Sequence, residues 1–309
     1  MKLVFCGTPL FAVPSLEHLA QAGFEIQLVV SQPDRQTGRG LELGIPAVKQ
    51  RAQQLGLRVI QPEKIKSNPE FQQQLTSLKP DAIIVVAYGR IIPPWMLQIP
   101  PLGNINVHAS LLPKYRGAAP IQWAIANGET VTGVTTMRLD EGLDTGNILL
   151  QRELAIGRED TALTLSPRLA EVGGDLLIET LRGLQSGSVH PIPQDNSQAT
   201  LAPLLKKEDG LVDFSRTAEE INNRMRGFQP WPGATTRFRG KGFKLIAARP
   251  VQDGKAAPGE LRVTADRLIA GCGGSSWLEL LEVQPEGKKA MSAREFINGY
   301  RPLTGEHLG

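Results

Sequence analysis

Asn106-Val107-His108 places an amide and an imidazole two residues apart, and the run continues Ala109-Ser110-Leu111-Leu112-Pro113. In an extended strand alternate residues share a face, so Asn106 and His108 point to one side and Val107 to the other. Both polar side chains can donate hydrogen bonds to a single developing oxyanion, which is the charge that acyl transfer must stabilise. The pair therefore indicates acyl-transfer chemistry.

An imidazole in such a site needs a carboxylate that sets its tautomer or stabilises its charged form. Asp144 is our leading candidate, in a loop that follows the strand-like run 133–139, and Asp140 and Glu141 are its rivals. A structural interpretation also stays open at this point, with His108 as a buried, hydrogen-bonded histidine and the others as turn or cap residues. Ser110 lacks the setting of a nucleophile elbow, so we do not expect it to act as a nucleophile.

The elements that must position these residues form an alternating pattern. Strand-like runs at 3–6, 24–31, 58–61, 81–88 and 105–108 alternate with helical segments, which predicts an α/β fold with an open, mostly parallel sheet. The β-branched run 81–88 is typical of a strand buried on both faces. Ligands bind at the carboxyl ends of such strands, so the loops after Cys6, Val30, Ala87 and Val107 should line the site. Gly7-Thr8-Pro9 lacks the later glycines of a dinucleotide turn, and we expect no NAD.

In the last third of the sequence, the predicted elements change from alternating strands and helices to a series of short strands. A long helix is predicted over 160–184, and the breaker-rich segment 185–197 follows it. Short strands predicted at 211–214, 235–238, 244–248, 259–264, 267–270 and 278–283, with one helix near 218–226, favour a small barrel. We therefore expect a first domain over 1–188, a linker over 189–207 and a second domain over 208–309.

Composition bounds the function further. The 309 residues are 41% hydrophobic and 21% charged, as in a globular protein, and no apolar run is long enough for a membrane span. Two cysteines and four histidines show no metal-binding spacing, so we expect no metal. Residues 206–309 carry 17 basic against 13 acidic side chains, and residues 1–205 carry 17 against 18. The basic stretch 216–249 fits either a nucleic-acid surface or an ordinary solvated one.

The run 106–121, NVHASLLPKYRGAAPI, resembles the signature of the formyltransferase family that uses 10-formyltetrahydrofolate. Six further stretches are similar to it: FCGTP at 5–9, QPDR at 32–35, VVAYG at 85–89, GLDTG at 142–146, FQPWP at 228–232 and QPEGKKAMS at 284–292. The matches extend nearly from end to end, and the C-terminal ones resemble the tRNA-directed branch of the family.

The resemblance implies a Rossmann-like first domain and an OB-fold-like β-barrel, with 10-formyltetrahydrofolate as cosubstrate and initiator methionyl-tRNA as formyl acceptor. Because the sequence shows no membrane-spanning run and begins unlike a signal or transit peptide, we expect a cytoplasmic protein, and we expect a monomer. The residues that it implies are Asn106, His108 and Asp144 for catalysis, Val86, Tyr88, Ser110, Leu111, Leu112 and Pro113 for folate, and Arg35, Arg39, Lys206 and Lys207 for tRNA.

One position departs from the family pattern. Where many members carry two lysines after the arginine matched by Arg39, this chain has Leu41 and Glu42, which should weaken attraction to phosphate. Two other functions are alternatives. The first is a folate enzyme that formylates a nucleotide or amino sugar or hydrolyses formyl-folate, for which a basic second domain would be useless. The second is a non-catalytic RNA-binding protein, which would not need the polar trio.

Overall fold

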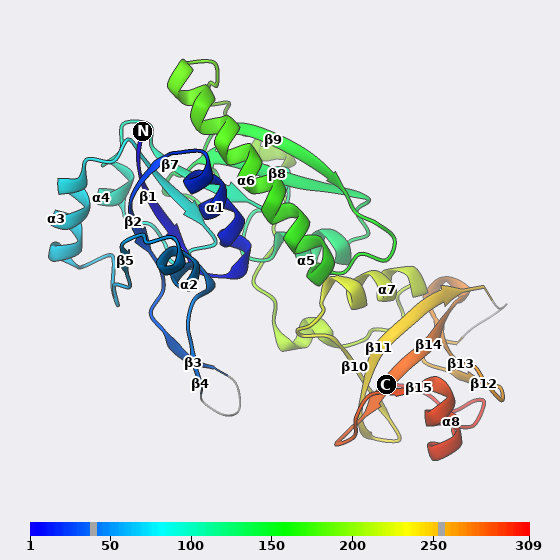
Figure 1. Cartoon of the computed structure of the whole chain (residues 1–309). Coiled ribbons are helices and arrows are strands. Elements are labelled where there is room, and N and C mark those ends of the chain that lie inside the picture. Colours follow the sequence, from blue (N-terminus) through cyan, green and yellow to red (C-terminus); the bar gives the residue numbers. More distant parts are fainter. Residues whose placement is uncertain (38–41, 253–256) are drawn as a thin grey trace. The chain divides into compact units, whose positions relative to one another are not determined.

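The computed structural model describes residues 1–37, 42–252 and 257–309, and only the backbone of residues 36, 37, 42 and 43. The chain divides into two compact units. The first unit contains residues 1–120, 131–155 and 166–203, and the second contains residues 121–130, 156–165 and 204–309. Each unit has its own sheet (Figure 1).

The first unit is built on a sheet with the strand order β5-β2-β1-β6-β7-β8-β9. Neighbours from β5 to β7 are parallel, and β8 and β9 complete the sheet in antiparallel pairing, so the expected open, mostly parallel sheet is confirmed. The strands are β1 (Lys2–Gly7), β2 (Glu25–Val30), β5 (Val59–Ile60), β6 (Ala82–Val86), β7 (Asn104–His108), β8 (Val131–Arg138) and β9 (Ile148–Ala155). A separate hairpin joins β3 (Arg35–Thr37) to β4 (Glu42–Gly44).

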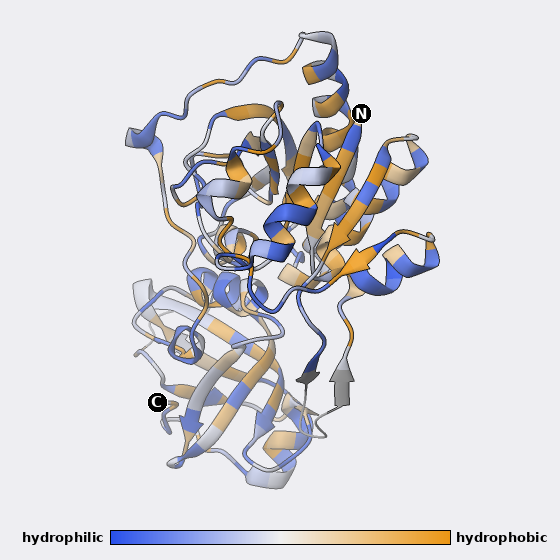
Figure 2. Cartoon of the chain, turned by 90° about the vertical axis from the view of Figure 1, so that its left-hand side faces the viewer, coloured by the Kyte–Doolittle hydropathy of each residue, from blue (hydrophilic) through white to orange (hydrophobic). Residues whose placement is uncertain are grey.

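The central strand β6, Ala-Ile-Ile-Val-Val, is buried at every position because helices cover both faces of the sheet. Figure 2 shows the strands near the N-terminus coloured hydrophobic over most of their length, with hydrophilic residues at some of their ends. On one face, α6 approaches so closely that a Cβ at Gly173 would lie 2.9 Å from Val107, and one at Gly174 would lie 2.6 Å from His18 of α1. On the other face, Phe71 of α3 and Met96 of α4 join the strands in one core cluster.

The helices of this part of the chain begin where the sequence permits. Pro14 and Pro69 occupy first-turn positions, where a missing N–H costs nothing, and Asn68 caps α3 by accepting a hydrogen bond from Phe71 N. The long helix predicted over 160–184 is confirmed as α6. The helices up to residue 203 are η1 (Leu10–Ala12), α1 (Val13–Gln21), α2 (Ala47–Gln54), α3 (Pro69–Leu78), α4 (Pro94–Leu97), α5 (Pro120–Ala126), α6 (Ala162–Ser186) and η2 (Asn196–Gln198). Of these, α5 after Pro120 and α6 up to Leu165 belong to the second unit.

The second unit contains an antiparallel sheet with the order β10-β11-β14-β13-β12, with β15 paired to β14. The segment His307-Leu308 pairs with Glu260 beside β12 and with Phe238 of β10, so it joins the two edges of the sheet and closes the expected small barrel. A cluster of buried residues that includes Phe238, Phe243 and Phe296 forms its core. The strands are β10 (Ala234–Phe238), β11 (Lys241–Val251), β12 (Leu261–Val263), β13 (Leu268–Cys272), β14 (Ser276–Pro285) and β15 (Met291–Ser292).

Reciprocal capping boxes start the two α-helices that lie within residues 204–309. Thr217 and Glu220 bond each other's backbone N–H groups at the start of α7 (Ala218–Gly227), and Ser292 and Glu295 do the same for α8 (Ala293–Tyr300). The strand predicted over 211–214 is wrong. Leu211 follows the short 3-10 helix η3 (Lys207–Gly210) and makes a single isolated bridge to Thr235, and the pairing does not extend along the chain because a turn begins at Phe214. The turn η4 (Gly273–Ser275) links β13 and β14.

Candidate active site

The strand β7 carries the polar pair and lies between β6, to which it is parallel, and β8, to which it is antiparallel. Asn106 pairs with Val85 and Met137, and His108 pairs with Thr135. Because Val107 faces α6, the alternation of the strand turns Asn106 and His108 to the opposite face. The predicted arrangement of these two side chains on one face is therefore the one that the structure has.

His108 is almost fully buried, and both of its ring nitrogens face oxygen atoms. Nε2 lies 3.0 Å from the backbone oxygen of Tyr115, which can only accept a hydrogen bond. Nδ1 lies 3.8 Å from Oδ2 of Asp144, a distance suited to an ion pair but too long for a hydrogen bond. An imidazolium, which donates from both nitrogens, thus finds an acceptor on either side of the ring.

Asn106 offers the complementary group. It is only partly buried, and within the described part of the chain its side-chain amide has no hydrogen-bond partner. An amide that is reachable and unpaired can donate to a ligand without first breaking a bond inside the protein. Asn106 and His108 together therefore give this face of β7 two donors for one oxyanion.

The loop after β8 brings Asp144 to the imidazole. Asp144 has a φ of 52°, in the left-handed region that non-glycine residues rarely adopt. Its Oδ2 accepts a hydrogen bond of 2.9 Å from the backbone N–H of Gly117, and its backbone oxygen accepts one of 2.8 Å from Nε2 of Gln194. A Cβ at Gly146 would lie 1.7 Å from the Arg138 oxygen, so glycine is required where the loop folds back on itself.

The two rival carboxylates have different surroundings. Oδ1 of Asp140 accepts hydrogen bonds from Gly142 N at 3.0 Å and from Thr145 Oγ1 at 2.7 Å, so its carboxylate is used within the loop itself. Glu141 is exposed. Of the three acidic residues, Asp144 is the one with an oxygen within ion-pair distance of His108.

The segment 110–113 is fixed to β8 and β9 beside the polar pair. Thr135 donates to the backbone oxygen of Ser110 at 2.7 Å and accepts from Leu112 N at 3.1 Å, while Gln151 donates to the Leu112 oxygen at 2.8 Å. The Ser110 hydroxyl donates to the Lys114 oxygen at 2.6 Å and is buried, which is not the setting of a nucleophile. Leu111 and Pro113 are partly exposed, so they are the members of this segment that can present apolar surface to a ligand.

At the end of β6, the structure separates exposed from buried positions in a way that the sequence did not suggest. Val86 is buried, and the ring of Tyr88 lies in the core cluster with Phe71 and Met96. Burial raises the pKa of the Tyr88 hydroxyl far above its ordinary value, with a smaller contribution from Cys6. The exposed positions are Ala87 and Gly89, both with positive φ, so contacts with a ligand here would come from the backbone of this turn.

The residues predicted to contact tRNA are described unequally. Arg35 is exposed at the start of the β3–β4 hairpin, whereas Arg39 and the side chain of Glu42 lie outside the described residues. Lys206 and Lys207 are both exposed, and the backbone N–H of Lys206 donates to Asp209 at 2.6 Å. Arg35 belongs to the first unit and the two lysines to the second.

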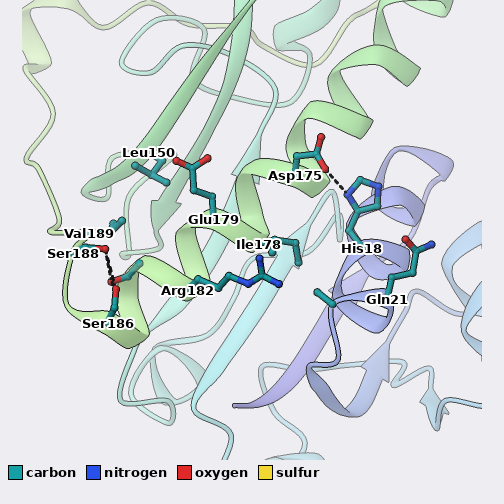
Figure 3. A pocket seen from close by; sticks show the side chains of 12 residues that line it. His18, Gln21, Leu150, Asp175, Ile178, Glu179, Arg182, Ser186, Ser188 and Val189 are labelled. Atoms are coloured by element: carbon teal, nitrogen blue, oxygen red, sulfur yellow. Dashed lines mark hydrogen bonds and ion pairs between the residues drawn. The ribbon is translucent and has the colours of Figure 1, made fainter.

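A wide hollow elsewhere on the first unit carries none of the predicted site residues. Its lining comes from α1, β9 and α6 and from the residues that follow α6. Figure 3 shows His18 facing Asp175, whose Oδ1 lies 3.2 Å from Nδ1, and Nε2 of the same ring lies 3.2 Å from Glu171. Its histidine is thus paired with two carboxylates, and we assign this hollow no catalytic role.

Sequence reasoning did not single out several residues that support the site. Thr135 anchors the segment 110–113, Gly117 holds the carboxylate of Asp144, and Gln194 holds its backbone. Thr135 and Gly117 lie inside recognisable segments of sequence, but their contacts are with residues far along the chain. Gln194 lies in a stretch that we predicted to be a linker, where no local pattern marks a supporting role.

Comparison with known proteins shows the family to which the chain belongs. Residues 1–181 match the family model described as formyl transferase, and residues 204–301 match the one described as formyl transferase, C-terminal domain. The chain belongs to the formyl transferase family. It is 62% identical over 309 residues to a methionyl-tRNA formyltransferase of Koribacter versatilis, covering 100% of this chain and 99% of that protein. A methionyl-tRNA formyltransferase of Acidobacterium capsulatum is 61% identical over 312 residues and is covered completely, as is this chain.

A solved structure shares the fold at much lower identity. The N-formyltransferase from Helicobacter canadensis, in complex with folinic acid and dTDP-3-aminofucose, superposes with a TM-score of 0.68 at 20% identity, covering 92% of this chain and 99% of that one. No helix among the described residues is long and apolar enough to span a membrane. The described residues also include no group of three or more His, Cys, Asp or Glu side chains that could hold a metal ion.

Proposed function

We propose that this chain transfers the formyl group of 10-formyltetrahydrofolate to the α-amino group of methionine esterified to initiator tRNA. The observation that carries the proposal is identity of 62% and 61%, from end to end, with two methionyl-tRNA formyltransferases. The donors on β7 and the carboxylate beside them are the groups that direct formyl transfer needs, which supports the same conclusion.

In this proposal the acceptor amine attacks in its neutral form. An ordinary α-amino group has a pKa of roughly 7.7–8.0, so a useful fraction is neutral near pH 7. Asn106 donates from its unpaired amide to the formyl oxygen as negative charge develops there. His108 donates the N–H that Tyr115 accepts when no substrate is bound. These two hydrogen bonds strengthen as the new C–N bond forms and the bond to the folate nitrogen breaks.

In this proposal Asp144 stabilises charge on His108 and assists proton transfer. Its carboxylate stabilises a positive imidazole and takes part in moving the proton from the attacking amine to the leaving nitrogen. The separation of 3.8 Å between Nδ1 of His108 and Oδ2 of Asp144 is compatible with this role, because catalytic hydrogen bonds often shorten only when substrate is bound. No covalent enzyme intermediate is needed.

The surroundings of the trio fit a pterin, which is flat with polar edges. The exposed turn at Ala87 and Gly89 offers backbone groups, and the partly exposed Leu111 and Pro113 offer apolar surface. We include Ser110, Leu112, Val86 and Tyr88 in the folate site as buried residues that support these surfaces. When bound there, 10-formyltetrahydrofolate supplies the formyl group.

The tRNA acceptor requires a further surface. We assign catalysis to residues 1–188, a linker to 189–207 and tRNA binding to 208–309. We also assign phosphate contacts to Arg35 and Arg39 of the catalytic range and to Lys206 and Lys207 at the end of the linker. The excess of basic over acidic side chains in residues 206–309, 17 against 13, supports this division. The proposal places the protein in the cytoplasm as a monomer.

One assay separates this function from its rivals. Purified protein is incubated with 10-formyltetrahydrofolate and methionyl-tRNA, and formylmethionine is measured after the ester bond is hydrolysed. We expect formylmethionine to accumulate only when both substrates are present. Release of formate, transfer to a small amine or nucleotide sugar in place of methionyl-tRNA, or tight tRNA binding without turnover would each overturn the proposal.

A further inference from the structure

The segment that leaves the catalytic domain is attached to the candidate site. Residues 166–203 belong to the first unit, and Ile192 exchanges two backbone hydrogen bonds of 2.8 Å with Ile148 of β9. Further along, Arg116 N donates to the Thr200 oxygen at 2.9 Å, and Ala202 N donates to the Arg116 oxygen at 2.7 Å. This stretch therefore runs beside both the loop that carries Gly117 and the loop that carries Asp144.

Gln194 lies between these attachments and uses both ends of its side-chain amide. Nε2 donates to the backbone oxygens of Asp144 at 2.8 Å and Gly146 at 2.7 Å. Oε1 accepts from Nε of Arg116 at 3.1 Å and from its Nη2 at 2.7 Å. A guanidinium only donates and a carbonyl only accepts, so the amide can satisfy all these partners in one orientation only.

Arg116 holds the side-chain amide of Gln194 in this orientation. Its side chain is buried, and among the described residues it has no carboxylate within ion-pair distance. Besides Gln194, its partner is Oδ1 of Asn196, at 2.8 Å from Nη2. A buried cation that relies on amide oxygens holds them firmly, because leaving such a charge without acceptors is costly.

Asp144 depends on restraint from outside its own loop. A residue with a φ of 52° lies in a less populated backbone conformation, which contacts with the surroundings stabilise. Gln194 fixes the backbone oxygen of Asp144, and Gly117 fixes its carboxylate oxygen Oδ2. Because Arg116 immediately precedes Gly117, the same glutamine connects both restraints.

We propose that Gln194 is a positioning residue for formyl transfer, which sets the carboxylate of Asp144 against the ring of His108 through the backbone of the 142–146 loop. The inference rests on the proposed role of Asp144. Gln194 does not touch the reacting atoms. Its contribution is to keep a strained loop in the one arrangement that serves His108.

Gln194→Glu tests this with little change in shape. The new carboxylate still accepts from Arg116 and gains an ion pair, but it has no N–H for the Asp144 and Gly146 oxygens and repels them. The matched control is Asn196→Ala, which removes an Arg116 contact and leaves the bonds of Gln194 to the Asp144 loop in place. Both variants and the wild type are assayed for kcat, for KM of each substrate, for the pH dependence of kcat and for Tm.

We expect Gln194→Glu to lower kcat roughly 10- to 100-fold, because displacements near 1 Å cost about this much in catalysis. KM values should change less than about twofold, because Gln194 does not contact the substrates. The pH profile of kcat should shift, because it depends on the arrangement of Asp144 and His108, whereas a general loss of folded protein would not shift it. Asn196→Ala should keep kcat within about twofold and the wild-type profile.

Two results would overturn the inference. One is a kcat for Gln194→Glu within twofold of wild type, and the other is a loss that Asn196→Ala matches with a parallel fall in Tm. Failure of the proposed function itself would be distinguishable, because the wild type would then form no formylmethionine in the same assay.

Discussion

The backbone N–H of Gly117 lies 2.9 Å from Oδ2 of Asp144, the same carboxylate oxygen that lies 3.8 Å from Nδ1 of His108. The orientation of the carboxylate is therefore set by the backbone of a loop about 27 residues away, and the imidazole approaches an oxygen whose place is already fixed. A substrate that draws His108 toward Asp144 needs to move only the ring.

Asp144→Asn should cripple formyl transfer while leaving folate binding intact. The amide keeps an oxygen for Gly117 N but loses the charge that stabilises the imidazolium, and we expect a loss of roughly 10²- to 10⁴-fold. Single-turnover rates and folate titration measure the two effects separately. Asp140→Asn is the control in the same loop and should keep most of the activity. Near-normal turnover of Asp144→Asn would remove Asp144 from the mechanism.

Gly117→Ala should damage both stability and transfer. Gly117 has a φ of 121°, and a Cβ there would lie 2.6 Å from the Ala202 oxygen. We expect the free energy of unfolding to fall by roughly 1–3 kcal/mol, measured by urea titration. Gly23→Ala is the control, because Gly23 also has a positive φ but no atom within 4 Å of an added Cβ. It should lose stability without losing transfer at a permissive temperature. Equal transfer by both variants would contradict the role given to Gly117.

Glu279 should make the stability of the second unit sensitive to acid. Burial favours the neutral carboxyl, but hydrogen bonds from Arg249 at 2.8 Å and Arg267 at 3.0 Å outweigh it and lower the pKa of Glu279. A lowered pKa in the folded state gives stability that is present above the unfolded value, roughly 4.3, and is lost as pH falls through the folded value.

Glu279→Gln checks this directly. At neutral pH the variant should lose about 1 kcal/mol of unfolding free energy, because both arginine partners are largely exposed and screened. Urea titrations at several values between about pH 6 and pH 3 should show a shallower loss of stability in the variant. Parallel curves for the two proteins would show that Glu279 does not account for the acid sensitivity.

Glu42→Lys should tighten tRNA binding at low salt. The substitution replaces a negative charge by a positive one in the loop that carries Arg35 and Arg39. Each added phosphate contact makes the slope of log affinity against log salt concentration more negative by about one. Filter binding at several salt concentrations measures both affinity and slope. Glu25→Lys makes the same change at the first residue of β2, at the amino edge of the sheet, and should have little effect. Equal gains from the two variants would indicate a general charge effect.

The sequence predicted the first sheet and the polar pair well, because both depend on local patterns. The β-branched run in β6 and the alternation around Val107 are visible in short windows. The hairpin partner β9 was missed, since an edge strand with alternating exposure lacks a strong apolar run. The helix α8 was also missed, although Ser292 and Glu295 at its start have the spacing of a capping box in the sequence.

The choice of carboxylate could not be predicted from spacing. Asp140, Glu141 and Asp144 lie within five residues, and only the folded loop turns Asp144 toward His108 and ties Asp140 to Gly142 and Thr145. The role of Gln194 could not be predicted from the sequence for a related reason. Its contacts join side-chain and backbone groups about 50 residues apart, and such contacts leave no periodic trace in sequence.

The pairing of His307 and Leu308 with Glu260 and Phe238 also has a consequence for biosynthesis. The strands β10 to β14 can pair as soon as they leave the ribosome, but the sheet edges at Phe238 and at Glu260 stay open until residues 307 and 308 have emerged. During that interval both edges present unpaired N–H and C=O groups to other chains. Translation of an mRNA truncated before the codon for residue 307 would therefore give a protein whose first unit is intact. Its second unit would keep unpaired sheet edges and aggregate through them.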